Sequence, residues 1–265
     1  MGGRFIAVSG PYGSTGKTSF ALALAIELAP SKLILIDADL SAPSLNCYLA
    51  ISEPVSQVAQ LARLAAQQRL TADVIANLTS RVKFRKFVFS VACGAASVPQ
   101  NVDRIRSEMP DLIANMLQHF DLVIVEFGRD NPSNVCPGLE PDQWFYVTGA
   151  DAVSIQRMLP NLDKIGNATV VFNRFRLSSS GRGARSELRQ LVDSFSQPEN
   201  EGSKPRNPPI VLPEDQAIHD AALLGGVPLQ QVKKNSPYLV ALRKGIKRVL
   251  QVSGSRRIRR LAKLN

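Results

Sequence analysis

The stretch of residues 8–19 constrains the fold of this chain more than any other part of its sequence. It reads Val-Ser-Gly-Pro-Tyr-Gly-Ser-Thr-Gly-Lys-Thr-Ser, follows a short apolar run, and leads into an Ala- and Leu-rich segment at residues 20–28 that favours a helix. A glycine-rich turn between a strand and a helix can point successive backbone N–H groups at one anion, beside the positive end of the helix dipole. The stretch therefore predicts a phosphate-binding loop.

The side chains of this loop have expected roles. Lys17 would reach the β- and γ-phosphates of a nucleotide, and Thr18 would ligate Mg²⁺. The residues expected to contact the nucleotide are Gly13, Ser14, Thr15, Gly16, Lys17, Thr18 and Ser19. The spacing departs from the standard motif, because Pro11 stands where its first glycine is expected and Gly10 lies one residue earlier. The loop therefore carries one extra residue or begins differently, and the alternative interpretation is a glycine-rich turn that binds nothing.

Length and composition limit the domain organisation. The chain has 265 residues, of which 45% are apolar, enough for one α/β domain over residues 1–250 followed by a basic tail over residues 251–265. Its three cysteines lack C-x-x-C spacing, which suits a reducing compartment and buried thiols. Residues 1–20 lack a signal-peptide pattern, and no apolar run is long enough to span a bilayer. We therefore expect a cytoplasmic protein.

Charge is distributed unevenly along the chain. Residues 1–220 hold all 22 acidic residues and 21 of the 32 basic ones, so this part carries a charge of −1. Residues 221–265 hold the other 11 basic residues and no acid, a charge of +11. The whole positive excess is therefore C-terminal.

Acidic residues follow two apolar runs. Asp37 and Asp39 end the run at residues 33–40, and Glu126 ends the run at residues 121–128. The carboxyl ends of strands in an open parallel sheet are where ligands bind, so these carboxylates are candidates for a Mg²⁺ shell and for activating water. The alternatives are that Asp37 and Asp39 cap the helix that follows, and that Glu126 forms a cap or an ion pair.

The remaining segments predict an α/β fold with a mostly parallel, twisted sheet and helices on both faces. Further strands are expected at residues 84–92, 143–148, 169–174 and 208–213. Two surface helices are expected within residues 54–80, and further helices at residues 109–120, 151–162, 184–195 and 236–250.

Several motifs in order resemble the MinD/ParA family of deviant P-loop ATPases. They are the loop, the segment Leu-Ile-Asp-Ala-Asp-Leu-x-x-Pro-Ser-Leu at residues 35–45, and the later strand ends, so that the resemblance covers residues 4–250. The loop is most similar to the branch with the pilus-positioning CpaE/TadZ proteins and the septum-site-like proteins of actinobacteria, whose loops read Gly-Pro-x-Gly-x-x-Gly-[Lys/Arg]-[Ser/Thr]. The resemblance implies a P-loop NTPase fold, ATP and Mg²⁺ as ligands, and a homodimer.

The resemblance also implies residue roles. Lys17 would neutralise phosphate charge and Asp39 would orient water, which makes these two the catalytic candidates. The metal shell would comprise Thr18, Asp37 and Glu126. Asn173, at the end of the strand at residues 169–174, would bond the adenine edge, since an amide offers both donors and an acceptor; its alternative is a turn residue. Pro213 would press against the base.

Two departures from the family leave two functions open. Relatives carry a signature lysine that reaches the partner's phosphates, and Tyr12 stands at that position; relatives also have Asp where this chain has Glu126. The first function is a weak ATPase switch whose nucleotide state controls dimerisation and the localisation of a septum, pilus or chromosome machine. The alternative is a scaffold that binds nucleotide with little hydrolysis and recruits pilus or division proteins. A metabolic enzyme of this fold, such as dethiobiotin synthase, lacks support from a second substrate motif.

The C-terminal tail has three open interpretations. Ile258, Leu261 and Leu264 recur every third residue among arginines and a lysine. This pattern can form a short basic helix on an anionic membrane, which would place the protein peripherally on the inner face of the cell membrane. DNA phosphates are the weaker alternative, and a solvated or protein-binding tail is the third.

Overall fold

The computed structural model describes residues 2–29, 32–51, 56–84, 87–94, 99–176, 193, 195, 207–218 and 235–252. The strands are β1 (Arg4–Ser9), β2 (Leu33–Asp37), β3 (Ser80–Phe84), β4 (Phe87–Ala92), β5 (Leu122–Glu126), β6 (Gln143–Gly149), β7 (Thr169–Phe175) and β8 (Ile210–Pro213). The helices are α1 (Lys17–Leu28), α2 (Leu45–Leu49), α3 (Gln57–Ala66), α4 (Ala72–Leu78), α5 (Pro99–His119), α6 (Pro132–Val135), α7 (Ala152–Met158), α8 (Leu162–Ile165) and α12 (Pro237–Val252), with a 3-10 turn, η1 (Leu159–Asn161).

The strands form one eight-stranded sheet in the order β3-β4-β2-β5-β1-β6-β7-β8. Every neighbouring pair is parallel except β3 and β4, which pair antiparallel at the edge. β1 lies between β5 and β6, and β2 is the next strand beyond β5. The carboxyl ends of the strands that carry the expected site residues therefore meet at one edge of the sheet.

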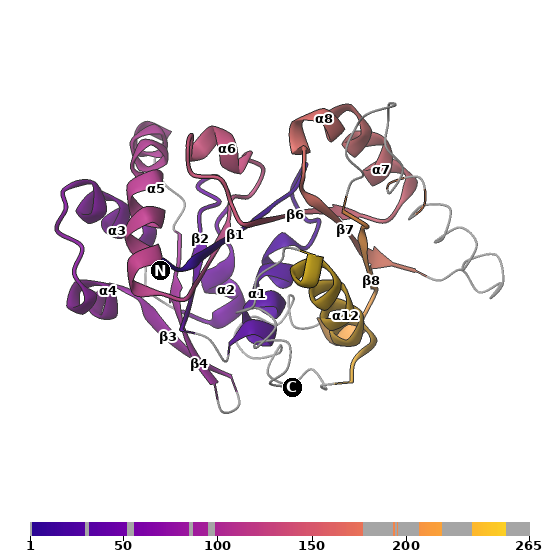
Figure 1. The fold of residues 1–265 in the computed structure, drawn as a ribbon, viewed down its shortest axis with the longest axis horizontal. Coiled ribbons are helices and arrows are strands. Elements are labelled where there is room, and N and C mark those ends of the chain that lie inside the picture. Colours follow the sequence, from indigo (N-terminus) through magenta and orange to yellow (C-terminus); the bar gives the residue numbers. More distant parts are fainter. Residues whose placement is uncertain are drawn as a thin grey trace.

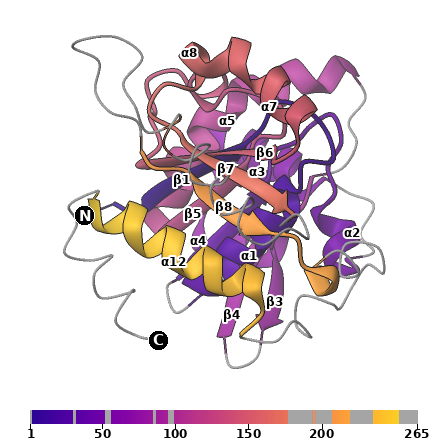
Figure 2. The ribbon, with the colours of Figure 1, turned by 90° about the vertical axis from the view of Figure 1, so that its right-hand side faces the viewer.

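Helices cover both faces of the sheet, which confirms the expected fold class (Figure 1). One face packs on α1 and α12, which share a core cluster with residues of β1, β2 and β5. The other face packs on α3 and α5, and beyond β6 a smaller cluster joins α7 and α8 to β7. Figure 2 shows α12 running beside α1, across the sheet from α5, α7 and α8.

The α1 helix is central, and every residue of it except Glu27 is buried. Glu27 forms a bidentate ion pair with Arg243 of α12, with N···O distances of 2.6 and 3.0 Å. The ion pair fixes α12 against the helix that begins in the glycine-rich loop. No helix among the described residues is both long and apolar enough to cross a membrane.

Three expectations about secondary structure were wrong in their boundaries. Residues 84–92 form no single strand, because β3 ends at Phe84 and β4 begins at Phe87, and the two strands pair antiparallel. The helix expected at residues 109–120 begins ten residues earlier, and it contains Pro110. The helix expected at residues 151–162 divides into α7, η1 and α8, because Pro160 lies in the 3-10 turn and cannot donate a helical hydrogen bond. The helix expected at residues 184–195 and the basic tail beyond residue 252 lie outside the described residues.

Candidate functional site

The loop between β1 and α1 is held in a conformation that suits an anion. Ser14 and Gly16 have left-handed φ angles of 60° and 84°, and turns of this kind direct backbone N–H groups into a concave nest. Gly10 starts the loop: its N–H donates to the Gly128 carbonyl at 3.0 Å, and a Cβ there would lie 2.3 Å from the Val147 carbonyl oxygen of β6. The close contact with β6 therefore leaves no room for a side chain at position 10.

Lys17 lies inside the loop rather than in solvent. Its side chain is buried, and its Nζ donates to the Tyr12 carbonyl at 3.0 Å. Burial lowers the pKa of the ammonium group and Arg129 lowers it further, whereas the carboxylates of Glu126, Asp39 and Asp37 act in the opposite direction. The Lys17 side chain thus crosses the loop and places its ammonium group beside the Tyr12 carbonyl, inside the predicted phosphate-binding loop.

Two carboxylates meet the first turn of α1. Glu126 and Asp37 end the neighbouring strands β5 and β2, in register with each other. Thr18 donates its hydroxyl to Glu126 Oε1 at 2.9 Å, and the same Oγ1 lies 2.8 Å from Ser44 Oγ. Burial raises the pKa of Glu126 to about 8, with a further rise from the charge of Asp37, and burial raises the pKa of Asp37 to about 6.

This arrangement fits a divalent cation. Buried carboxyl groups whose pKa values are raised gain stability from a nearby cation, and hydroxyl and carboxylate oxygens are the ligands that Mg²⁺ prefers. No cluster of three or more His, Cys, Asp or Glu side chains able to hold a metal occurs among the described residues. A metal at this edge would therefore rely on Thr18, on one or two of these carboxylates, and on phosphate or water oxygens.

The aspartates also shape the turn before α2. Asp37 Oδ2 accepts the backbone N–H groups of Ser44 and Leu45, each at 2.9 Å. Asp39 Oδ1 accepts those of Ser41 and Ala42 at 3.2 and 2.9 Å. Both aspartates thus make the backbone hydrogen bonds that the capping alternative expects. Asp39 also remains close to the loop, because it is half-buried and its carboxyl group lies against Gly128.

Asn173 joins the loop to β7. Its Nδ2 donates to the Thr15 carbonyl at 2.8 Å, and a Cβ on Gly16 would lie 2.2 Å from that nitrogen. Within the described part of the chain, the buried Oδ1 of Asn173 has no hydrogen-bond partner. The amide therefore keeps an unused acceptor beside the loop.

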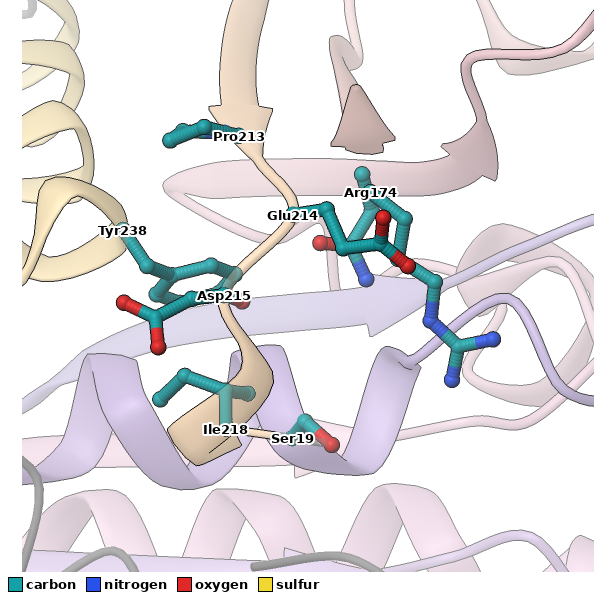
Figure 3. Close-up of a pocket in the computed structure, with 8 residues that line it drawn as sticks. Ser19, Arg174, Pro213, Glu214, Asp215, Ile218 and Tyr238 are labelled. Carbon is teal, nitrogen blue, oxygen red and sulfur yellow. The ribbon is translucent and has the colours of Figure 1, made fainter. Parts of the chain in front are cut away.

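A small pocket of about 20 Å³ lies beside Asn173. It is lined by Ser19, Asn173, Arg174, Pro213, Glu214, Asp215, Ile218 and Tyr238 (Figure 3). Among the residues described here, Asp215 Oδ2 and the Tyr238 hydroxyl are also buried without a hydrogen-bond partner. Pro213 ends β8 and lines this pocket.

A larger cavity of about 760 Å³ opens beside the loop and shares Asn173, Arg174 and Glu214 with the small pocket. Its lining combines residues 12–15 of the loop with residues at the carboxyl ends of β6 and β7, at the start of α7 and after β8: Tyr12, Gly13, Ser14, Thr15, Gly149, Ala150, Asp151, Ser154, Asn173, Arg174, Phe175, Arg176, Glu214 and Gln216. Its volume falls in the range of small-molecule and cofactor sites. Tyr12 supplies a ring at its edge, and the Arg157 guanidinium of α7 lies 5.4 Å from the centre of that ring.

The structure thus brings the expected loop, Asp37, Asp39, Glu126, Asn173 and Pro213 to one edge of the sheet. It adds Ser44, Asp215 and Tyr238, which the sequence analysis did not assign. Asp215 lies two residues after Pro213 and was within reach of sequence reasoning, whereas Tyr238 comes from α12 and its neighbours in the chain give no signal of a site.

Comparisons with known proteins agree with this geometry. The model of the CobQ/CobB/MinD/ParA nucleotide binding domain matches residues 6–228. A comparison with curated proteins gave no match.

Among solved structures, a ParA family ATPase from Chlorobium tepidum is 17% identical, with a TM-score of 0.68, covering 90% of this chain and 96% of that one. The septum site-determining protein MinD of Pyrococcus horikoshii, solved with Mg-ADP, is 19% identical, with a TM-score of 0.61 and coverage of 95% and 97%. MinD of Aquifex aeolicus, in a complex with MinC, is 19% identical, with a TM-score of 0.62 and coverage of 94% and 96%. With the fold, the loop and the family match in agreement, this chain belongs to the CobQ/CobB/MinD/ParA nucleotide-binding domain family.

Proposed function

We propose that this protein binds ATP with Mg²⁺ and works as a weak ATPase switch. The observation that carries the proposal is the cluster at the end of β1: a buried lysine bridging the loop, with a threonine hydroxyl on a buried carboxyl group one residue later. A solved neighbour from Pyrococcus horikoshii carries Mg-ADP, which supports a nucleotide and this metal for a chain of the same fold.

The chain's own residues divide the work in this proposal. Residues 13–19 hold the phosphates through backbone N–H groups, and Lys17 exchanges its bond to Tyr12 for phosphate oxygens. Thr18, Asp37 and Glu126 hold Mg²⁺, which when bound neutralises phosphate charge. The half-buried Asp39 orients water.

The base would lie on the Asn173 side of the loop. The free Oδ1 of Asn173 accepts a hydrogen bond from the adenine edge, and Pro213 packs on the base. The small pocket beside Asn173 has a volume of about 20 Å³, so its lining residues would have to move apart to admit a base.

Calorimetry with ATP and ADP, with and without Mg²⁺, tests the binding. We expect the wild-type chain to bind both nucleotides and the Lys17→Ala variant to lose most of that affinity. Arg81→Ala, which removes an exposed cation from the edge strand β3, is the control and should bind like wild type. No uptake by wild type, or equal uptake by Lys17→Ala, would refute the proposal.

A scaffold with little hydrolysis is the second candidate, and Tyr12 favours it. The family resemblance implies a lysine at this position, whereas here a neutral ring packs beside Arg157. A missing transition-state cation of this type costs several powers of ten in rate in arginine-finger enzymes. Phosphate release with and without lipid or DNA distinguishes the two candidates, since tight binding without turnover in all conditions would favour the scaffold.

The wider role that we propose is control of homodimerisation and of the place of a cellular machine. The resemblance of the loop to the pilus-positioning and septum-site-like branch supports it, as does the neighbour solved with MinC. The charge of +11 on residues 221–265 suits attachment to an anionic membrane. Sedimentation with anionic vesicles, with and without residues 253–265, tests the attachment; we expect truncation to abolish ATP-dependent pelleting, and equal pelleting would refute it.

A further inference from the structure

The turn after β5 brings a second cation to the loop. Arg129 lies in this turn, and its Nη2 is 3.4 Å from the position that a Cβ on Gly13 would take. The carbonyl of Tyr12, the residue before Gly13, holds the Lys17 ammonium group. The guanidinium group therefore approaches the same end of the loop as the lysine, the end where the β- and γ-phosphates bind.

The backbone just before Arg129 is fixed by hydrogen bonds to β1 and to the start of the loop. The carbonyl of Gly128 accepts the N–H of Gly10, and Phe127 N–H donates to the Val8 carbonyl at 2.8 Å. Gly128 has a φ of 61°, and a Cβ there would lie 2.4 Å from the Asp39 carboxyl carbon. The turn is thus bonded to β1 and the start of the loop, so the arginine is not carried by a freely moving segment.

The charges around Arg129 leave it available for an anion. Asp130, the acidic residue that follows Arg129 in the sequence, forms an ion pair with Arg106 of α5 at an N···O distance of 2.7 Å. Within the described residues Arg129 makes no ion pair, and its side chain is exposed. Arg129 contributes to the lowered pKa of Lys17, so the two cations repel each other where no anion separates them.

We propose that Arg129 is a second phosphate-binding residue of the loop, which recognises the terminal phosphate of a nucleoside triphosphate from within the same chain. Arginine suits this role because its planar fork can donate two parallel hydrogen bonds to phosphate oxygens. An exposed cation at the Gly13 end would stabilise a triphosphate more than a diphosphate, which has no group there. The inference rests on the proposed function, since it assigns a residue to the same nucleotide site.

Calorimetry of the full chain with Mg-ATP and Mg-ADP tests it, using Arg129→Ala and Arg129→Lys. Loss of a hydrogen-bonded charge pair should weaken ATP binding roughly tenfold or more, with less than about a threefold change for ADP. Lysine should restore part of the ATP affinity. Arg104→Ala, an exposed arginine of α5 with the same change of charge, is the matched control and should leave both affinities unchanged.

Three results would overturn the inference: unchanged ATP affinity in Arg129→Ala, equal losses for ATP and ADP, or an equal loss in Arg104→Ala. None of these would touch the proposed function, which Lys17→Ala tests. Failure of the wild-type chain to bind either nucleotide would instead refute the proposed function and this inference with it. Far-ultraviolet circular dichroism of each variant establishes that the fold is intact.

Discussion

Replacing Glu126 by glutamine should stabilise the empty protein at neutral and higher pH. Glu126 is 3% exposed, and its pKa is raised from 4.5 to about 8, first by burial and then by the charge of Asp37. Glutamine has the same length, and its amide oxygen can accept the hydroxyl of Thr18, but it never ionises. The substitution therefore removes the free-energy cost of a buried negative charge and keeps the hydrogen bond with Thr18.

The size of the effect follows from proton binding. Between pH 4.5 and 8 the folded chain keeps the Glu126 proton and the unfolded chain loses it, so the free energy of unfolding falls as pH rises, by about 1.4 kcal/mol per unit. Asp37, whose folded pKa is about 6, shows the same sign at lower pH. From pH 6 to 8 Glu126 thus accounts for a loss of about 2 kcal/mol in wild type, because the slope flattens near its folded pKa, and Glu126→Gln should show almost none of it.

Urea unfolding in EDTA at pH 6, 7 and 8 measures this difference. Trp144, the only tryptophan, lies on β6 and donates its indole N–H to Ser9 Oγ of β1 at 2.8 Å, so its fluorescence reports on the centre of the sheet. We expect the curves of wild type and variant to diverge steadily as pH rises. If the free energy of unfolding changes equally with pH in both proteins, or if the variant is less stable than wild type at pH 8, the carboxyl group is not held neutral.

Adding Mg-ATP should make wild type more stable than Glu126→Gln. The proposed metal shell needs the ionised carboxylate, so wild type should gain more free energy of unfolding from the ligand than Glu126→Gln does. An equal gain in both proteins would remove Glu126 from the metal shell, whatever the result in EDTA.

Two further substitutions test the loop and the helix packed behind it. Gly16→Ala should abolish nucleotide binding in calorimetry, since its φ is 84° and its Cβ would lie 2.2 Å from Asn173 Nδ2; Gly138→Ala, at a φ of 81° with nothing within 4 Å, is the matched control for backbone strain alone. Equal binding by both variants would contradict the tight fit. Arg243→Met should lower the free energy of unfolding by about 1–3 kcal/mol, because it leaves the largely buried Glu27 unpaired. A double-mutant cycle with Glu27→Gln that gives no coupling would contradict that account.

The buried strands were predictable because each one is short, apolar and bounded by polar residues. β2 and β5 have all five residues buried, so an apolar run was a sufficient signal. The edge hairpin was not predictable in the same way. β3 alternates between exposed and more buried residues, and the sequence between Phe84 and Phe87 has no glycine or proline to mark the end of β3. Local composition thus identified the centre of the sheet better than its edge.

The site divides along the same line. The location of Lys17, Thr18 and the strand-end carboxylates at one edge of the sheet was predictable, because it follows from the position of each residue in a loop or at the end of a strand. Ser44, Arg129 and Tyr238 were not, since each reaches the site through a contact with an element distant in the chain. Only the order of strands, with β1 between β5 and β6, brings these elements together.

The buried ionisable cluster of Glu126, Asp37 and Lys17 couples the stability of the fold to the binding of charged ligands. Glu126, Asp37 and Lys17 are all buried, and burial opposes the charged form of each of them. A divalent cation beside the carboxylates and phosphates beside the lysine would favour those charged forms, so part of the binding energy offsets a cost that the empty protein already bears. The loop is joined to β5 through Thr18 and to β7 through Asn173, and α1 is joined to α12 through Glu27. A change of charge state at the cluster would therefore occur beside the first turn of α1, the helix that is joined to α12 through Glu27 and Arg243.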